Sequence, residues 1–204
     1  FFRDTAVVST GHVKIMTRAY NKESQLLPND LALLGVDQLL AQLSQEYSDY
    51  FWTPRITSIG LLDVPDENGE TLKQSPVFAV GIDMFSKHSR QIEMWELERK
   101  LTAGKLPKKA DEVLLSTRLS KRLNLNAGET VTFISSTMHG AFTTFNFYVT
   151  GTFSLNLGQV DKEMMLIDIS GARLALDMGD AASEILGYSH SLYFDDQASV
   201  DVRE

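Results

Sequence analysis

The four histidines, at positions 12, 88, 139 and 190, are the side chains best suited to bind a metal or move a proton near neutral pH. No two of them have the H-x-x-x-H or H-E-x-x-H spacing that places both imidazoles on one face of a helix. The chain also lacks cysteine, which excludes thiolate metal sites, cysteine nucleophiles and disulfides. We therefore expect no metal site, and His139, beside Gly140, is predicted to occupy a turn.

Patterns for phosphate binding and for nucleophilic catalysis are missing as well. Gly104-Lys105 is followed by Leu106, and no glycine stands at the earlier position that the Walker motif requires. Neither G-x-G-x-x-G nor the G-x-S-x-G elbow occurs. The adjacent carboxylates at 66–67 and 195–196 are interpreted as solvated turns, because neighbours in a strand point to opposite faces. The sequence thus predicts no catalytic residue and no cofactor.

A group of six basic side chains falls within residues 105–122. Such a group could attract anionic lipid headgroups, at about 1 kcal/mol for each cation near a charged membrane surface. Asp111 and Glu112 offset part of its charge, so an ordinary solvated face is the favoured interpretation.

Apolar side chains in predicted loops are the stronger candidates for a contact surface. Met138 and Phe142 flank the predicted turn, where an apolar pair has less reason to be buried. Methionine and phenylalanine also adapt to varied apolar ligands. The candidate residues for contact with a cargo or partner are Met138, His139, Phe142, Tyr20, Leu26 and Leu27.

Composition sets broad limits on the fold and its partners. The chain has 204 residues, 43% of them hydrophobic, and a net charge of −8, so a core without disulfides is expected and a basic nucleic-acid surface is excluded. The apolar runs are shorter than the roughly 20 residues of a membrane span, and no signal-peptide pattern is recognised. The chain opens at Phe1 and closes at Glu204, and we interpret it as a piece of a longer protein.

Alternation and turn signals predict the strands of a helix-on-sheet fold. The Asn-Gly pair in the turn at 65–69 tolerates positive φ and is a strong hairpin signal. The predicted strands are 11–17, 52–64, 77–82, 112–115, 130–134, 145–153, 164–169 and 191–194.

Helices are predicted where a capping residue precedes apolar positions at helical spacing. The most regular has Asp30 in its first turn and an apolar stripe through Tyr47. The second has charged residues on several faces and is expected to lie on the surface. The capping residues and their helices are Asn29 (30–47), Ser89 (through 101), Ser116 (through 123) and Ser170 (to Gly179).

Short motifs follow one another in a recognisable order from Gly104 onward. They are Gly104-x-x-Pro107, Asp111-Glu112-Val113-Leu114-Leu115-Ser116, Leu123-Asn124-Leu125, Gly128-Glu129-Thr130-Val131, Val149-Thr150-Gly151-Thr152-Phe153 and Met165-Leu166-Ile167-Asp168-Ile169. Gly11-His12-Val13-Lys14-Ile15 and Val80-Gly81-Ile82-Asp83 precede them. This order resembles the MacB-like periplasmic core domain of FtsX-type ABC transporter permeases, which include LolC and LolE of lipoprotein-releasing systems.

The resemblance implies an α+β fold with two lobes. Residues 1–86 and 184–204 would form a porter-like α/β lobe, and 87–183 an inserted, mostly β second lobe (Sabre-like) with short helices. The domain would lie in the periplasm, between the first two transmembrane helices of a bacterial inner-membrane permease. It would have no enzyme activity, because the ATPase is expected on a separate domain or subunit, and the permease would pair with a second copy or paralogue.

The resemblance also implies a transport role. The domain would bind or guide a lipidated or apolar cargo and transmit ATP-driven motion, with a periplasmic lipoprotein carrier, a lipoprotein or an adaptor as partner. In LolC-type subunits a long proline-containing hook recruits the carrier, whereas the matching residues 135–144 are short and contain no proline. The alternatives are a MacB-type efflux or mechanotransmission domain that docks an adaptor, and a stand-alone hydrolase or binding protein.

Overall fold

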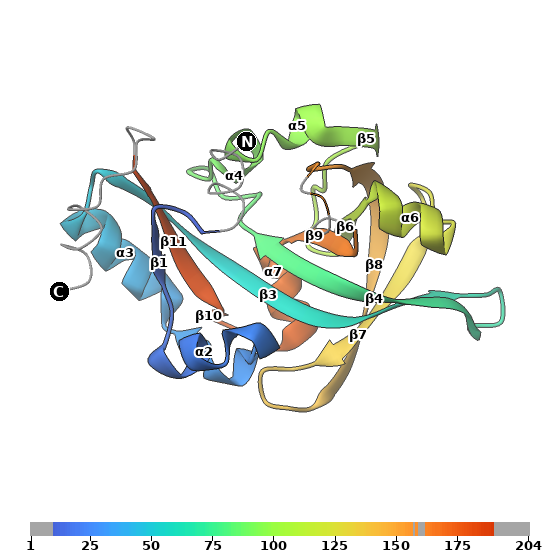
Figure 1. Ribbon diagram of the computed structural model, residues 1–204, viewed down its shortest axis with the longest axis horizontal. Coiled ribbons are helices and arrows are strands. Elements are labelled where there is room, and N and C mark those ends of the chain that lie inside the picture. Colours follow the sequence, from blue (N-terminus) through green and yellow to red (C-terminus); the bar gives the residue numbers. More distant parts are fainter. Residues whose placement is uncertain (1–9, 157, 159–161, 190–204) are drawn as a thin grey trace.

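The computed structural model describes residues 10–156, 158 and 162–189, which form a mixed α/β structure rich in strands (Figure 1). The predicted α+β class is confirmed. The strands are β1 (Val13–Ile15), β2 (Leu33–Leu34), β3 (Tyr50–Pro65), β4 (Thr71–Ile82), β5 (Leu101–Gly104), β6 (Glu112–Ser116), β7 (Thr130–Ser136), β8 (Phe142–Phe153), β9 (Met164–Asp168), β10 (Ala181–Ala182) and β11 (Glu184–Ser189). The helices are α2 (Arg18–Lys22), η1 (Ser24–Leu26), η2 (Asn29–Leu31), α3 (Val36–Glu46), α4 (Gln91–Met94), α5 (Leu97–Lys100), α6 (Thr117–Leu123) and α7 (Ile169–Leu176).

One mixed sheet organises the described part of the chain. Its strand order is β1-β11-β3-β4-β9-β6-β8-β5, and β7 pairs with both β3 and β8. The long β3–β4 hairpin crosses the whole molecule, and its turn lies at the predicted Asn-Gly pair, where Gly69 has φ 83° (Figure 1). The pairs β4–β9 and β6–β8 are parallel. The sheet thus joins strands of both predicted lobes, and the division at 86/87 and 183/184 remains a prediction.

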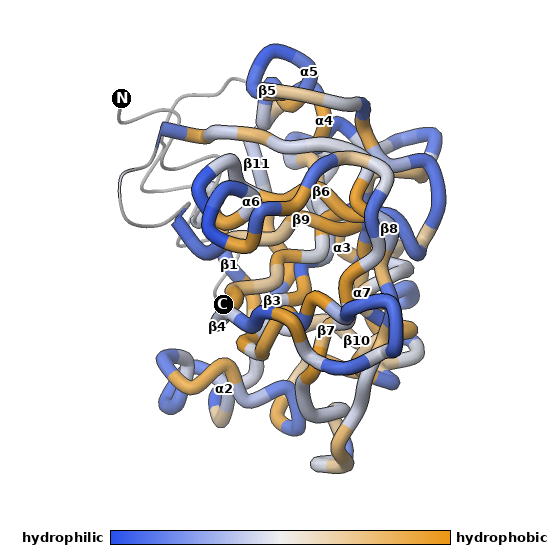
Figure 2. Tube along the Cα trace, turned by 90° about the vertical axis from the view of Figure 1, so that its right-hand side faces the viewer, coloured by the Kyte–Doolittle hydropathy of each residue, from blue (hydrophilic) through white to orange (hydrophobic). Residues whose placement is uncertain are grey.

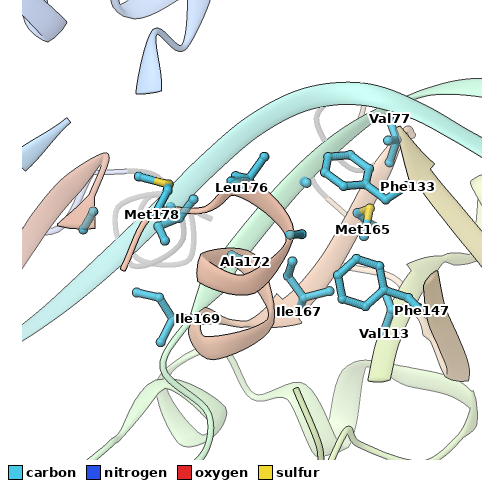
Figure 3. Close-up of a cluster of buried hydrophobic side chains, with 14 of the residues drawn as sticks. Val77, Val113, Phe133, Phe147, Met165, Ile167, Ile169, Ala172, Leu176 and Met178 are labelled. Atoms are coloured by element: carbon cyan, nitrogen blue, oxygen red, sulfur yellow. The ribbon is translucent and has the colours of Figure 1, made fainter. Parts of the chain in front are cut away.

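Both faces of the sheet bury apolar side chains. The larger cluster lies beside α7, where the rings of Phe133 and Phe147 lie next to Met165 and Ile167 (Figure 3). The smaller cluster includes Trp95, at the end of α4, together with side chains of β4, β6 and β9. Apolar residues follow the strands through the interior, whereas many of the connecting loops are hydrophilic (Figure 2). Alternation therefore marks the buried side of β7 and of the first half of β8, whereas β6 and β9 are buried on both faces.

The first predicted helix begins later than expected. Leu33 and Leu34 pair with β10 as strand β2, and Gly35, with φ 65°, then turns the chain into α3 at Val36. Asn29 therefore does not cap this helix. Asn29 is a residue type that favours a helix cap. The residues after it pair with β10 instead, so tertiary contacts override the local preference.

Two other helix predictions needed correction. The helix predicted from Ser89 is divided into α4 and α5 at Glu96, which has φ 52°. It is not superficial, because Trp95 and Leu97 are fully buried. The cap of α7 is Asp168, whose Oδ1 accepts a hydrogen bond from the Ser170 backbone N at 2.8 Å, and not Ser170 itself.

Other local predictions were right. Ser116 caps α6, and its Oγ accepts a hydrogen bond from the Leu119 backbone N at 3.2 Å. The strands predicted at 52–64, 130–134 and 145–153 are contained in β3, β7 and β8. The strand predicted at 191–194 lies outside the described residues. No helix in the described ranges is both long enough and apolar enough to cross a membrane.

Strand β11 was not predicted, because it carries a buried charge instead of an alternating pattern. Glu184 forms ion pairs with Lys14 (2.9 Å) and with the buried Arg55 (3.8 Å). Arg55 also donates from Nη2 to the Tyr188 hydroxyl at 3.3 Å and lies 5.3 Å from the centre of the Trp95 ring. This group connects β1, β3 and β11 with the end of α4. The buried Glu184 carboxylate is compensated by the buried Arg55 and by Lys14, which is more exposed.

Candidate binding pocket

A pocket of about 490 Å³ lies between the η1–η2 segment and the tip of the β7–β8 hairpin. These two segments are far apart in the sequence but meet beside α2, at the lower edge of the molecule in Figure 1. The volume falls within the range of small-ligand sites. The pocket is lined by residues 26–30, 58–59 and 135–140.

The floor of the pocket coincides with an interruption in the sheet. One edge of β3 pairs with β4, and the other pairs with β11 at residues 50–55 and with β7 at 61–63. Within the part of the chain that the structure describes, residues 56–60 therefore pair with no strand on that second edge. Side chains supply the hydrogen bonds that a strand would make there: Asn29 Nδ2 donates to Thr57 O at 2.9 Å, and Ser135 Oγ donates to Ile59 O at 2.9 Å.

Asn29 fastens the η1–η2 segment to this edge. Besides its bond to Thr57, its Oδ1 accepts from Ser183 Oγ at 2.7 Å, and that hydroxyl accepts from the Thr57 backbone N at 3.0 Å. All three residues are buried. Sequence reasoning missed Asn29, Ser58 and Ser135 as pocket residues, because short polar side chains are common and only strand register shows which edge of the sheet they reach.

Tyr20 is not a surface residue, which corrects its choice as a contact candidate. It is only 2% exposed, and its hydroxyl lies 3.1 Å from Thr57 Oγ1. Burial raises the pKa of the Tyr20 phenol. Tyr20 therefore belongs to the structure that holds the pocket wall in place.

The hairpin tip forms the second wall. The predicted turn at His139-Gly140 is confirmed, and Thr137 Oγ1 stabilises it by accepting from the backbone N atoms of His139 and Ala141. Met138 is half-buried against the core, and its backbone N donates to Leu176 O at 2.8 Å. This bond ties the tip to the end of α7.

The structure brings four of the six candidate residues together. Leu26, Leu27, Met138 and His139 all line the pocket. Phe142 lies outside it on β8, opposite Ser136, with 75% of its surface exposed. The candidate surface therefore comprises the pocket and the nearby exposed ring.

The remaining sequence candidates have ordinary structural surroundings. In the basic group, Arg122 pairs with Glu163 at 2.9 Å and Arg118 donates to Gly158 O at 3.1 Å, as expected of a solvated face. No group of three or more histidine or acidic side chains that could hold a metal occurs in the part of the chain that the structure describes.

Comparisons with known proteins place the fold. No protein-family profile and no curated protein matches the chain. The periplasmic region of MacB from Actinobacillus actinomycetemcomitans is similar in structure, with a TM-score of 0.59 and 16% identity, covering 93% of this chain and 78% of that one. The extracellular domain of the ABC-type transporter YknZ from Gram-positive bacteria gives a TM-score of 0.55 and 9% identity, over 87% and 81% of the two chains. The chain therefore has the fold of MacB-like periplasmic domains of ABC transporters, as the order of its motifs predicts.

Proposed function

We propose that this chain is the periplasmic domain of an ABC transporter permease in a bacterial inner membrane. The observation that carries the proposal is the fold shared with the periplasmic region of MacB over 93% of the chain. The domain itself is non-catalytic. It transmits motion from an ATPase on a separate domain or subunit, and it works beside a second permease copy or paralogue.

The cargo we propose is lipidated or apolar, as in lipoprotein-releasing systems of the LolC/LolE type. Exposed apolar side chains at one end of the molecule support this choice: Leu26 is 67% exposed and Phe142 75% exposed. Shielding an acyl chain from water stabilises it by about 0.8 kcal/mol for each buried CH₂ group. The pocket and the neighbouring Phe142 ring would provide part of that shielding.

A second candidate is a MacB-type efflux or mechanotransmission domain that docks a periplasmic adaptor. The structural likeness to MacB favours it. So does the compact turn at 137–141, where Thr137 N donates to Ala141 O at 2.8 Å. A turn this short lacks the long hook that recruits a carrier in the resembling LolC-type subunits.

Site-specific photo-crosslinking in the parent permease separates the candidates. A photoreactive residue replaces Phe142 or Leu26, and the matched control replaces Leu72, a 64% exposed leucine on the β3–β4 hairpin. Adducts with a lipoprotein or its carrier at 142 and 26, but not at 72, support the lipoprotein-releasing role. Adducts with an adaptor support the second candidate. Equal labelling at all three positions would contradict a dedicated contact surface.

Phe142→Asp tests the same surface by function. Its side chain is exposed, so we expect unchanged stability and reduced transport by the parent permease. Adding Met138→Asp would obscure the result, because Met138 contacts the core and a buried carboxylate there destabilises the fold. Unaltered transport by Phe142→Asp would remove this ring from the mechanism.

A further inference from the structure

The charged groups that line the pocket favour a positively charged ligand. Among the lining residues that the structure describes, Asp30 is the only one with a carboxylate, and none is a lysine or arginine. Asp30 is exposed to solvent at the rim. His139 is the other titratable lining residue, and its Nε2 lies 4.0 Å from Asp177 Oδ2. A ligand at this rim therefore meets fixed negative charge and no fixed positive charge from the described lining.

The backbone donors around the turn are already used within the protein. The amides of Thr137, Met138 and Gly140 donate to the carbonyls of Ala141, Leu176 and Thr137 respectively. The amide of His139 donates to Thr137 Oγ1. An anionic headgroup needs such N–H donors to replace its water. The N–H groups of these four amides are therefore not available to an anionic headgroup.

The floor of the pocket presents acceptors instead. Ser135 Oγ donates to Ile59 O and lies 3.2 Å from Ser58 Oγ, so at least one lone pair of the Ser135 hydroxyl is left for a ligand. One of the two hydrogens of the Asn29 side-chain amide is donated to Thr57 O, and Asn29 Oδ1 accepts from Ser183 Oγ. Groups that donate hydrogen bonds and carry positive charge are therefore the better match to this surface.

The walls are apolar and exposed. Leu26, on η1, and Ile59, on β3, are 67% and 59% exposed, and Leu27, Pro28 and Met138 complete the apolar lining. Covering such surface is favourable by roughly 25 cal/mol for each Å² removed from water. An alkyl chain is the simplest group that would cover these walls.

From these features we infer that the pocket binds amphiphiles that carry an ammonium headgroup, and that it discriminates against carboxylate-headed ones. The alkyl part contacts the leucine and isoleucine walls, and the ammonium group lies at Asp30 and the acceptor floor. The net charge of −8 also attracts cations to the molecule. The inference deepens the proposed cargo contact and rests on it for its biological meaning.

The test compares decylammonium with decanoate, which have alkyl tails of similar length and opposite charge. Each is titrated below its micelle concentration into the 204-residue chain at about pH 8, where a primary ammonium group such as that of lysine stays charged. Binding is followed by backbone amide NMR shifts. We expect shifts at pocket residues with decylammonium and at least roughly tenfold weaker binding of decanoate, because one rim carboxylate attracts the first and repels the second.

Three variants assign the effect to residues. Asp30→Asn is expected to weaken the binding of decylammonium about threefold to fivefold. It should also reduce the difference in affinity between decylammonium and decanoate. Leu26→Ala should lower the affinity for both ligands by the same factor, since it alters only the apolar wall. Glu98→Gln is the matched control, because Glu98 is an exposed carboxylate on α5. It should change the affinity for neither ligand.

Three results would overturn the inference. The pocket could bind both headgroups with equal affinity, or Asp30→Asn could bind decylammonium as tightly as the wild type. The third is that no pocket residue shifts at up to about 10 mM of either ligand. The proposed function would survive such results if crosslinking at 142 and 26 still captured a cargo. It would fail separately if crosslinking gave no selective adduct while decylammonium bound as expected.

Discussion

Replacement of Asn29 by alanine tests whether side chains hold the pocket wall to the interrupted edge of β3. The variant loses the bond from Nδ2 to Thr57 O and the bond that Oδ1 accepts from Ser183. At about 1 kcal/mol for each buried bond, with a further cost for an unsatisfied carbonyl, the free energy of unfolding should fall by about 2–3 kcal/mol. For a chain of this length that corresponds to a melting temperature lower by about 5–10 °C.

Urea unfolding measures this loss, and an unchanged m-value would show that the unfolded state is not altered. Amide exchange should also accelerate at Thr57, whose backbone N donates to Ser183 Oγ. Asn146→Ala is the matched control, because Asn146 is exposed on β8 and its Oδ1 accepts a hydrogen bond from Thr132 Oγ1 of β7 at 2.8 Å. It should cost less than about 0.5 kcal/mol. If the Asn29 variant is as stable as this control, the network does not anchor the segment.

Two further predictions concern the sheet and its pH dependence. Gly60→Ala would place a Cβ 2.4 Å from Ile134 O and 2.7 Å from the Phe133 ring, so we expect a loss of about 1–3 kcal/mol in urea unfolding; a wild-type midpoint would contradict this close approach of β3 and β7. Burial raises the pKa values of Tyr20 and Tyr188 above 10, their ordinary value. As the pH rises, the unfolded chain loses these protons before the folded chain does. The free energy of unfolding should therefore be constant with respect to these groups below about pH 10 and should fall above it. Unfolding midpoints and tyrosinate absorbance followed together check this, and a stability that is flat above that pH would refute it.

The sequence by itself determined most of the strands, several turns and the order of motifs that indicated the fold. These features depend on neighbours along the chain: alternation in β8, the Asn-Gly turn of the β3–β4 hairpin, and the Ser116 cap of α6. Local backbone preference and burial of one strand face are enough to predict them. The sequence also indicated apolar residues in loops, and Leu26, Leu27 and Met138, together with His139, line the pocket.

Only the tertiary structure decided what those residues form together. Asn29 has the type and position of a helix cap, but the pairing of β2 with β10 moved the helix start to Val36 and left Asn29 to bond with β3. Tyr20 was chosen from the sequence as a surface contact, yet it is buried and its hydroxyl lies 3.1 Å from Thr57 Oγ1. The pocket exists because β11 and β7 share one edge of β3 and leave a gap between them. Register between distant strands sets that gap, and no window of neighbouring residues contains it.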